Sequence, residues 1–479
     1  MVERNRWANN FSEWFQNVIS NAELVDYRYP IKGCGVWLPY GFKLRNSILN
    51  ILRKLLDETG HEEILFPLLI TSEMIGKESE HVESFEEQIF WVTQAGKRKL
   101  EEKLALRPTS ETAFAPMLKL WIRSHADLPK KLYQIVSVFR YETKATRPLI
   151  RLREVTTFKE AHTSHESFED AEKQVKEALN IYNRFFDELC LPYLISKRPV
   201  WDKFAGALYS IAYDTIFPDG RTLQIGTVHN LGQSFSKVFD ITFEKRDGTR
   251  DYIWQTCYGV SERVVAAVVS IHGDDHGLVL PPKIAPIQVI IIPIPYKGYE
   301  EKVAEKAKEV ENKLKVAEIR VKLDLREKLT PGSKFYEWEL KGVPLRIEVG
   351  PKDIEQKTLT MVRRDTLERV KIDESKIVDE TRKTLDEIQK SLRKKAWEWF
   401  LSRVKKTDNF QEIIKLSNEK PLVIETYWCG KNECGLALED QTNMNVLGIS
   451  LESGEELKNK KCSVCGEEAQ FTIRLAKTY

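Results

Sequence analysis

Apolar positions along the chain follow helical and strand spacings in turn, which is the pattern of a mixed α/β protein. Apolar residues three or four apart predict helices over 10–22, 44–56, 112–122, 168–186, 264–271 and 303–314. Short apolar or alternating runs predict strands over 64–70, 223–229, 252–258, 287–293, 319–323, 345–349 and 358–362.

The predicted strand over 64–70 is wholly apolar and contains Pro67. Because proline lacks the N–H that a sheet ladder needs, this strand is expected at a sheet edge or an interface. A homodimer contact could use its apolar surface. A buried core strand with a bulge is an equal alternative.

Residues 137–162 predict two strands joined by a polar loop. Alternation would place Arg140 and Glu142 on one face, and Arg151 and Arg153 on one face of the partner strand. Guanidinium groups bind phosphate oxygens through paired hydrogen bonds, so this set suits a polyphosphate ligand. A solvated hairpin with surface ion pairs explains the same spacing equally well.

Length and composition restrict the class of protein. A chain of 479 residues is too long for one ordinary core, so two to four domains are expected. Charged residues make up 30% of the chain but the formal net charge is only +2, which leaves nucleic-acid binding to a local patch. No apolar run approaches the ~20 residues that span a bilayer, and the N-terminal residues lack the apolar core of a signal peptide. We therefore expect a cytoplasmic protein without a membrane partner.

Thr109, Ser110 and Glu111 stand directly before the helix predicted over 112–122. A hydroxyl and a carboxylate at this position are typical of helix caps, because they satisfy the first free N–H groups or oppose their partial charge. The carboxylate could instead be the counter-charge of a cationic amine. Both roles can coexist if the helix end lines a pocket.

A second polar group lies further along the chain. Gln224, Thr227 and His229 belong to a predicted strand, where a lone histidine is more often structural. Arg263 follows Gly259 and begins the next helix. The helix dipole disfavours a cation there unless an anion is bound, so this arrangement favours a phosphate ligand.

The chain has seven cysteines. Cys34, Cys190 and Cys257 stand alone and are expected to be small buried hydrophobic residues. The others form one Cys-x4-Cys pair and one Cys-x2-Cys pair: Cys429, Cys434, Cys462 and Cys465. In a cytosolic chain such pairs favour a four-thiolate zinc site over disulfides, and a closed site of this kind is structural.

Three segments resemble the motifs of the class II aminoacyl-tRNA synthetases: the helix before Pro67, the segment from Phe139-Arg140-Tyr141-Glu142 to Arg153-Glu154, and residues 259–263. Four further segments are similar to the prolyl-tRNA synthetase family, of the archaeal and eukaryotic type: 107–111, 203–206, 226–232 and 272–282. The ordered set extends over essentially the whole chain. The resemblance implies a ligase that activates L-proline with ATP and Mg²⁺ and transfers the prolyl group to the 3′ end of tRNA(Pro).

The resemblance also implies roles for individual residues, with Arg140 and Arg263 acting in catalysis. It assigns proline binding to Thr109, Glu111, Arg140, Glu160, His162, Phe204 and His229. It assigns ATP binding to Arg140, Glu142, Arg151, Leu152, Gln224, Thr227 and Arg263. Where the family commonly has an aromatic residue that stacks on adenine, this chain has Val155. Phe158 would take that place if the register shifts at Thr156 and Thr157.

The implied fold is α/β (α+β multidomain). A class II catalytic domain on an antiparallel sheet is expected over 1–282, an anticodon-binding domain with a mixed α/β sheet over 283–385, and a small C-terminal α+β zinc domain over 386–479. In the second domain Glu339, Arg346 and Lys352 would read anticodon bases, with charges on a solvated face as the alternative. A homodimer through the region near Pro67 is expected. The spacing between the second and third motifs leaves no room for a large editing insertion, so no hydrolytic editing is expected.

Two other classes of function share parts of this pattern. A sister synthetase for threonine, glycine or histidine has the same fold, but the loop at 109–111 and the cysteine-bearing tail argue against it. A non-catalytic RNA-binding relative would lose the nucleotide residues, whereas the whole arginine and glutamate set is present.

Overall fold

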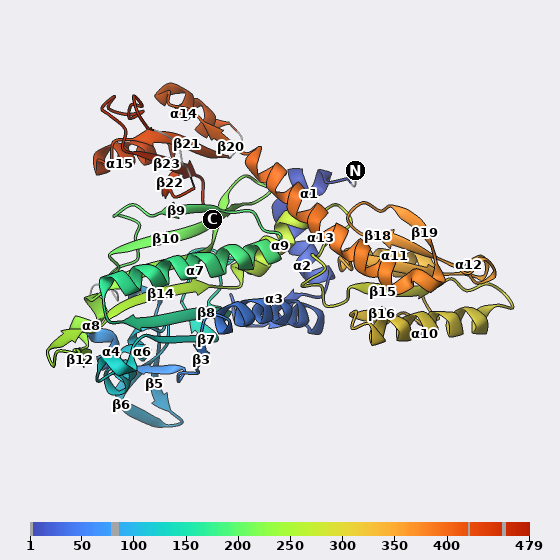
Figure 1. Cartoon of the computed structure of the whole chain (residues 1–479), viewed down its shortest axis with the longest axis horizontal. Coiled ribbons are helices and arrows are strands. Elements are labelled where there is room, and N and C mark those ends of the chain that lie inside the picture. The colour runs from blue at the N-terminus through green and yellow to red at the C-terminus, as the bar shows by residue number, and fades with distance from the viewer. Residues whose placement is uncertain (1–2, 78–85, 420–421, 453–456) are drawn as a thin grey trace.

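The computed structural model describes residues 3–77, 86–419, 422–452 and 457–479. Its main feature is an 11-stranded sheet (Figure 1). The order across the sheet is β20 (Val404–Lys406), β21 (Val423–Trp428), β23 (Phe471–Ala476), β22 (Asn445–Ser450), β9 (Leu194–Lys197), β10 (Tyr209–Ile216), β11 (Thr222–Gly232), β14 (Trp254–Val260), β8 (Glu154–His165), β7 (Lys130–Phe139) and β3 (Glu62–Glu63). The pairs β3–β7 and β20–β21 are parallel. The strands from β9 to β7 pair antiparallel, as expected for the catalytic part.

Helices cover this central sheet. The N-terminal helices are α1 (Asn5–Asn9), α2 (Phe11–Asn21) and α3 (Pro39–Asp57), and α9 spans Arg263–His272. The long helix α7 (Phe168–Glu188) lies along the sheet and packs against β11, β14 and β8 (Figure 1). Its apolar residues recur three or four apart, so that one face, including Val175, Tyr182 and Phe186, is buried against the strands. This layer makes the sheet a rigid floor for the residues on its opposite face.

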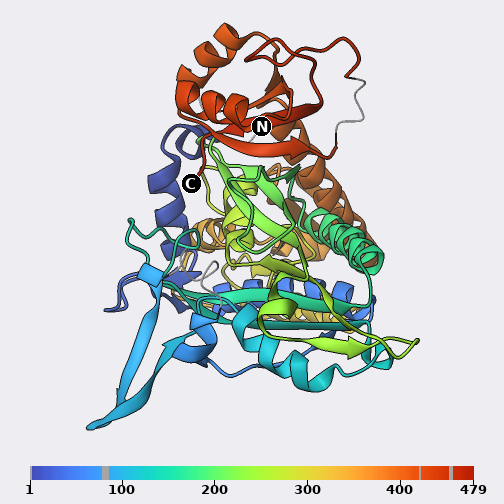
Figure 2. The same cartoon turned by 90° about the vertical axis from the view of Figure 1, so that its left-hand side faces the viewer.

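A smaller three-stranded sheet has the order β4 (Leu69–Thr71), β6 (Arg98–Leu106) and β5 (Phe90–Ala95), with helices α4 (Ser72–Gly76) and α6 (Glu111–Trp121) beside it. The β5–β6 hairpin projects from the body of the molecule (Figure 2). The strand predicted over 64–70 is wrong in extent, because only 69–71 pair. Pro67 interrupts the run, and Leu65 is left 78% exposed.

Four short strands and a helix complete the strands and α-helices described before residue 273. They are β1 (Val25–Asp26), β2 (Val36–Trp37), α8 (Ser234–Val238), β12 (Thr242–Glu244) and β13 (Arg250–Tyr252).

A separate five-stranded sheet follows, with its own apolar core. The strand order is β16 (Val321–Leu323), β15 (Val289–Pro293), β17 (Leu345–Val349), β18 (Thr358–Arg363) and β19 (Arg369–Asp373), and the helices are α10 (Glu300–Val316), α11 (Pro331–Leu340) and α12 (Pro351–Gln356). Strand β15 pairs parallel with β16 and with β17, whereas the pairs β17–β18 and β18–β19 are antiparallel. This confirms the expected mixed sheet.

Helix α13 (Ile377–Leu401) leads from this sheet to the C-terminal part (Figure 1). The predicted boundary between residues 385 and 386 falls inside this helix, and the division into three domains stays a prediction. The C-terminal part adds α14 (Phe410–Asn418) and α15 (Asn432–Thr442) to strands β20–β23.

The C-terminal strands continue the catalytic sheet, because β22 pairs with β9. At this contact Gly448 has φ +117°, and a Cβ atom there would lie 2.1 Å from the carbonyl oxygen of Lys197. Only glycine allows the two strands to approach this closely. A buried ion pair between Asp274 and Arg364 (2.6 Å) ties the segment after α9 to the segment after β18 of the five-stranded sheet. Among the described helices, none combines the length and apolarity that crossing a bilayer requires.

Candidate active site

A cavity of about 280 Å³ opens on the exposed face of β8, β14 and β11. All but one of the pocket residues predicted from the sequence line it: Thr109, Glu111, Arg140, Glu142, Arg151, Leu152, Glu160, Phe204, Gln224, Thr227, His229 and Arg263. The exception is His162, which is buried with its ring centroid 4.2 Å from that of Phe114.

The register of the central strands arranges the floor in rows. Glu160, Gly259 and Thr227 are direct neighbours across β8, β14 and β11. The next row on the same face holds His162, Cys257 and His229. Since residues two apart on a strand share a face, chain segments about a hundred residues apart meet on one surface.

Two β-bulges bring further residues to the cavity. In β8, Val138 pairs with Val155 and Val136 with Phe158, so that β8 has one extra residue at 156–157. Val155 and Phe158 therefore both line the cavity. The register shift that would bring Phe158 to the adenine position is therefore present. The centroid of the Phe158 ring lies 5.7 Å from the guanidinium of Arg140.

The second bulge lies in β11. Tyr213 pairs with Gly226 and Asp214 with Gln224, which leaves one extra residue in β11. Gln224 and Thr227 are three residues apart and still line the same cavity. The Oε1 atom of Gln224 accepts a hydrogen bond from Arg198 Nη2 (3.0 Å).

The loop between β7 and β8 corrects one prediction. Arg140, Glu142, Arg151 and Arg153 were expected on two strands, but β7 ends at Phe139 and β8 begins at Glu154, so these residues lie in the connecting segment. The segment folds on itself and on the N-terminal part instead of continuing the ladder. The N–H of Arg140 donates to the carbonyl of Arg153 (2.9 Å), and the N–H of Arg153 donates to Gly33 (3.0 Å).

One end of the cavity is cationic. The guanidinium of Arg263 donates from Nε to the carbonyl of Ile150 (3.1 Å), which holds it against the loop. Burial, and then the neighbouring charges of Arg140 and Arg151, lower the pKa of Arg263 to about 10. Guanidinium groups gathered this closely repel one another until an anion neutralises them.

The other end is acidic. The hydroxyl of Thr109 donates to Glu111 and to Oε1 of Glu160 (3.0 Å), and the hydroxyl of Ser110 also donates to Glu160. Gln134 Nε2 donates to Ser110 Oγ (2.8 Å) and fixes that hydroxyl. Burial, and then the charge of Glu111, raise the pKa of Glu160 to about 7.

The hydroxyl groups of the 109–111 loop do not cap helix α6. Ser110 is the N-cap residue of α6, and its side chain makes no capping hydrogen bond. The predicted hydroxyl cap is wrong, because the hydroxyls of Thr109 and Ser110 turn toward the carboxylates of Glu111 and Glu160 instead. The carboxylate of Glu111 does lie in the first turn of α6, where it opposes the helix dipole, and its role toward a cationic amine stays a prediction.

Aromatic rings form a wall beside the carboxylates. The rings of Phe204 and His229 lie 4.7 Å apart, and Nδ1 of His229 is hydrogen-bonded to the hydroxyl of Ser210 (2.8 Å). This contact orients the imidazole beside the Phe204 ring.

Two residues that line the cavity were not predicted to do so. Cys257 is buried, as expected, and its Sγ also donates a hydrogen bond to Glu111 Oε1 (3.2 Å). Its position two residues before Gly259 on one strand face was the available signal. Glu262 is buried and accepts a hydrogen bond from the N–H of Thr156 (2.6 Å), and burial raises its pKa to about 7.

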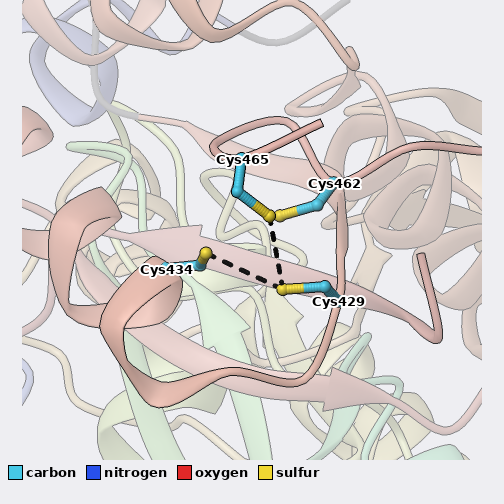
Figure 3. A group of neighbouring side chains, drawn as sticks. All are labelled: Cys429, Cys434, Cys462 and Cys465. Atoms are coloured by element: carbon cyan, nitrogen blue, oxygen red, sulfur yellow. Dashed lines mark hydrogen bonds between the residues drawn. The ribbon is translucent and has the colours of Figure 1, made fainter. Parts of the chain in front are cut away.

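The four C-terminal cysteines meet in one cluster, drawn from the end of β21, the start of α15 and the segment before β23 (Figure 3). Their sulfur atoms lie within 4.8 Å of one another, and Cys429 Sγ is 3.7 Å from the Sγ atoms of Cys434 and Cys465. Cys465 is exposed and the other three are buried. The donor set and spacing fit a tetrahedral metal ion.

In the five-stranded part, two of the three predicted anticodon residues are paired. Arg346 Nη1 lies 2.6 Å from Glu339 Oε1, and its Nε lies 3.0 Å from Glu348 Oε1. Lys352 is exposed on α12.

Comparison with protein families gives three consecutive matches. Residues 90–272 match the class II tRNA synthetase core domain (G, H, P, S and T), residues 288–384 an anticodon-binding domain, and residues 410–479 the C-terminal domain of prolyl-tRNA synthetase.

Whole-chain relatives agree with these matches. The proline-tRNA ligase of Sulfurisphaera tokodaii is 55% identical over 481 residues, with 100% of both chains covered. That of Ignicoccus hospitalis is 56% identical over 473 residues, with 98% of each covered. Among solved structures, Giardia lamblia prolyl-tRNA synthetase in complex with prolyl-adenylate superposes with a TM-score of 0.96 at 37% identity, over 100% of this chain and 99% of that one.

Proposed function

The chain belongs to the prolyl-tRNA synthetases of class II, and we propose that it activates L-proline with ATP and transfers the prolyl group to the 3′ end of tRNA(Pro). The observation that carries this proposal is the set of charges that lines one cavity, three guanidinium groups and two buried carboxylates, with Arg140 acting on both Glu160 and Arg263. A polyphosphate and the nitrogen of an amino acid need these opposite charges side by side.

Proline would occupy the acidic end. Its ring nitrogen is a secondary ammonium with two N–H donors, for which Thr109 and Glu111 supply acceptors. The rings of Phe204 and His229 would contact the apolar ring of proline. Glu160 and His162 support the pocket from below, and Arg140 would hold the proline carboxylate.

ATP would occupy the cationic end. Arg140 would contact the α-phosphate, and Arg151 and Arg263 the rest of the triphosphate together with Mg²⁺. Glu142 would accept from the adenine amino group. Leu152 through its backbone, Gln224 and Thr227 complete the nucleotide site, and Phe158, which the bulge in β8 brings to the cavity, is the aromatic residue for the adenine ring.

The chemistry then needs positioning and charge neutralisation more than a protein nucleophile. An oxygen of the proline carboxylate attacks the α-phosphorus in line, the bond to the β-phosphate oxygen breaks, and pyrophosphate leaves. A terminal hydroxyl of tRNA next attacks the carbonyl carbon of prolyl-adenylate, and AMP leaves. In both steps the arginine groups offset negative charge that moves onto phosphate oxygens.

The remaining parts would serve tRNA and assembly. Glu339, Arg346 and Lys352 would read anticodon bases, which requires the fork of Arg346 to exchange its carboxylate partners for a base edge. A cytoplasmic homodimer through the region around Pro67 is supported by the exposed apolar side chains of Leu65, Leu68 and Leu69. Sedimentation at the mass of a single chain would contradict the dimer.

Exchange of radioactive pyrophosphate into ATP, measured with each of the twenty amino acids, tests the proposed function. We expect L-proline to support the fastest exchange, because it alone fits the secondary-ammonium acceptors and the aromatic wall together. Threonine, glycine and histidine, the substrates of the sister enzymes, should not support it. Exchange no faster with proline than without amino acid would overturn the proposal.

Two isosteric variants separate the ends of the cavity in the same assay. Glu111→Gln should raise the KM for proline by about 10- to 100-fold, since it removes a charge-assisted hydrogen bond, and should change the KM for ATP much less. Glu142→Gln, the matched control at the other end, should raise the KM for ATP and change the KM for proline much less. Equal effects of Glu111→Gln on both substrates would contradict its assigned place.

For the cysteine cluster we propose a structural zinc ion, because four thiolates close a tetrahedral site without an open position. Cys462→Ser should lose one zinc per chain relative to the unsubstituted protein, by mass spectrometry of metals, and should lower the Tm. Cys190→Ser, a buried cysteine outside the cluster, is the control and should keep its zinc. An unchanged zinc content in Cys462→Ser would refute the site.

A further inference from the structure

A second group of metal-binding side chains lies at the floor of the active-site cavity. The ligand atoms of Glu111, His162 and Cys257 all lie within 4.8 Å of one another, and each of the three residues is buried. The Sγ of Cys257 already donates to Glu111 Oε1 (3.2 Å). Cys257 and His162 are cross-strand neighbours on β14 and β8, so the sheet register fixes their proximity.

One atom of this group has no partner among the described residues. Nε2 of His162 is buried and makes no hydrogen bond, although buried polar atoms are nearly always satisfied. Bound proline would not supply a hydrogen-bond partner for this nitrogen. Its ring offers no polar atom besides the nitrogen, and that nitrogen is received by Thr109 and Glu111 in the proposed function. The unpartnered nitrogen therefore points to a different ligand.

The donor set identifies the chemical class of that ligand. A carboxylate oxygen, an imidazole nitrogen and a thiolate sulfur are the donors of zinc and related thiophilic ions, whereas magnesium and calcium select oxygen donors. Three protein donors leave a fourth position open. Since Glu111 and Cys257 both line the cavity, that position faces the space proposed for substrate.

We propose that Glu111, His162 and Cys257 form a site for a thiophilic divalent cation such as Zn²⁺, and that this cation and proline exclude each other. The exclusion rests on the proposed function, which gives proline the same carboxylate of Glu111. When the ion binds, it replaces the thiol proton that Cys257 now donates to Glu111, and that proton leaves to solvent. Zinc in this pocket blocks amino-acid activation without touching the ATP end.

Direct metal binding tests the site without relying on activity. The full-length protein, with its C-terminal cysteine cluster loaded with zinc and with a non-thiol reductant, is titrated with Co²⁺. We expect one further equivalent, with a thiolate-to-cobalt charge-transfer band, in the unsubstituted chain and in Cys190→Ser. The band should vanish in Cys257→Ser and on addition of saturating proline. No further equivalent, or a band that survives in Cys257→Ser, would overturn the inference.

The kinetics of pyrophosphate exchange provide a second test of the metal site. Zn²⁺ should raise the KM for proline in pyrophosphate exchange and leave kcat and the KM for ATP unchanged. Because losing even a supporting partner costs metal sites 10–100-fold, Cys257→Ser should need at least about 10-fold more zinc for the same effect. Inhibition that proline does not relieve would contradict the shared site.

The cobalt titration and the exchange kinetics together distinguish a failure of the metal site from a failure of the proposed function. Proline-dependent exchange without a second metal ion refutes the metal site alone. A metal band that requires Cys257 but ignores proline, together with no proline-dependent exchange, refutes the proposed function and leaves the metal site standing.

Discussion

Two buried carboxylates that share one hydroxyl group set the electrostatics on which the rest of the cavity depends. Glu111 and Glu160 both accept from Thr109, in a place where an isolated negative charge would be costly. The hydroxyls lower that cost, and the raised pKa of Glu160 means that this carboxyl group is about half protonated near pH 7. The pair is prepared to receive a cation, because a further positive charge favours the ionised form of Glu160.

The cationic end of the cavity is the complement of this pair. Arg140, Arg151 and Arg263 are gathered by the β7–β8 loop and by the first turn of α9, and the charges of Arg140 and Arg151 lower the pKa of Arg263, an effect that a bound anion would oppose. Arg140 links the two groups, because its charge acts on Glu160 as well as on Arg263. A phosphate chain and an amino acid bound on either side of this guanidinium would lie side by side, which is what in-line attack requires.

The sequence predicted much of this site, and what it missed has a common physical cause. The order of the motifs predicted the pocket residues, and the cysteine spacing predicted the C-terminal cluster. Both predictions depend only on residue type and on separation along the chain. The ends of β7 and β8, the bulges that bring Phe158 and Gln224 to the cavity, and the contact of Cys257 with Glu111 depend on pairing between strands. The alternation along one strand does not show where a bulge will shift the pairing with its partner. The turn of Ser110 away from its helix was hidden for the same reason, since its acceptor lies on β8.

Proton release on proline binding tests the central claim, that the carboxylate pair is the counter-charge of the proline nitrogen. A group with a raised pKa is partly protonated at pH 7, and an adjacent ammonium shifts it to the ionised form. Calorimetry in buffers of different ionisation enthalpy should therefore detect release of about half a proton per proline at pH 7, given the pKa of about 7 at Glu160. Proline affinity should weaken as the pH falls below 7, and Glu160→Gln should abolish the release. No proton release, or the same release in Glu160→Gln, would contradict the account.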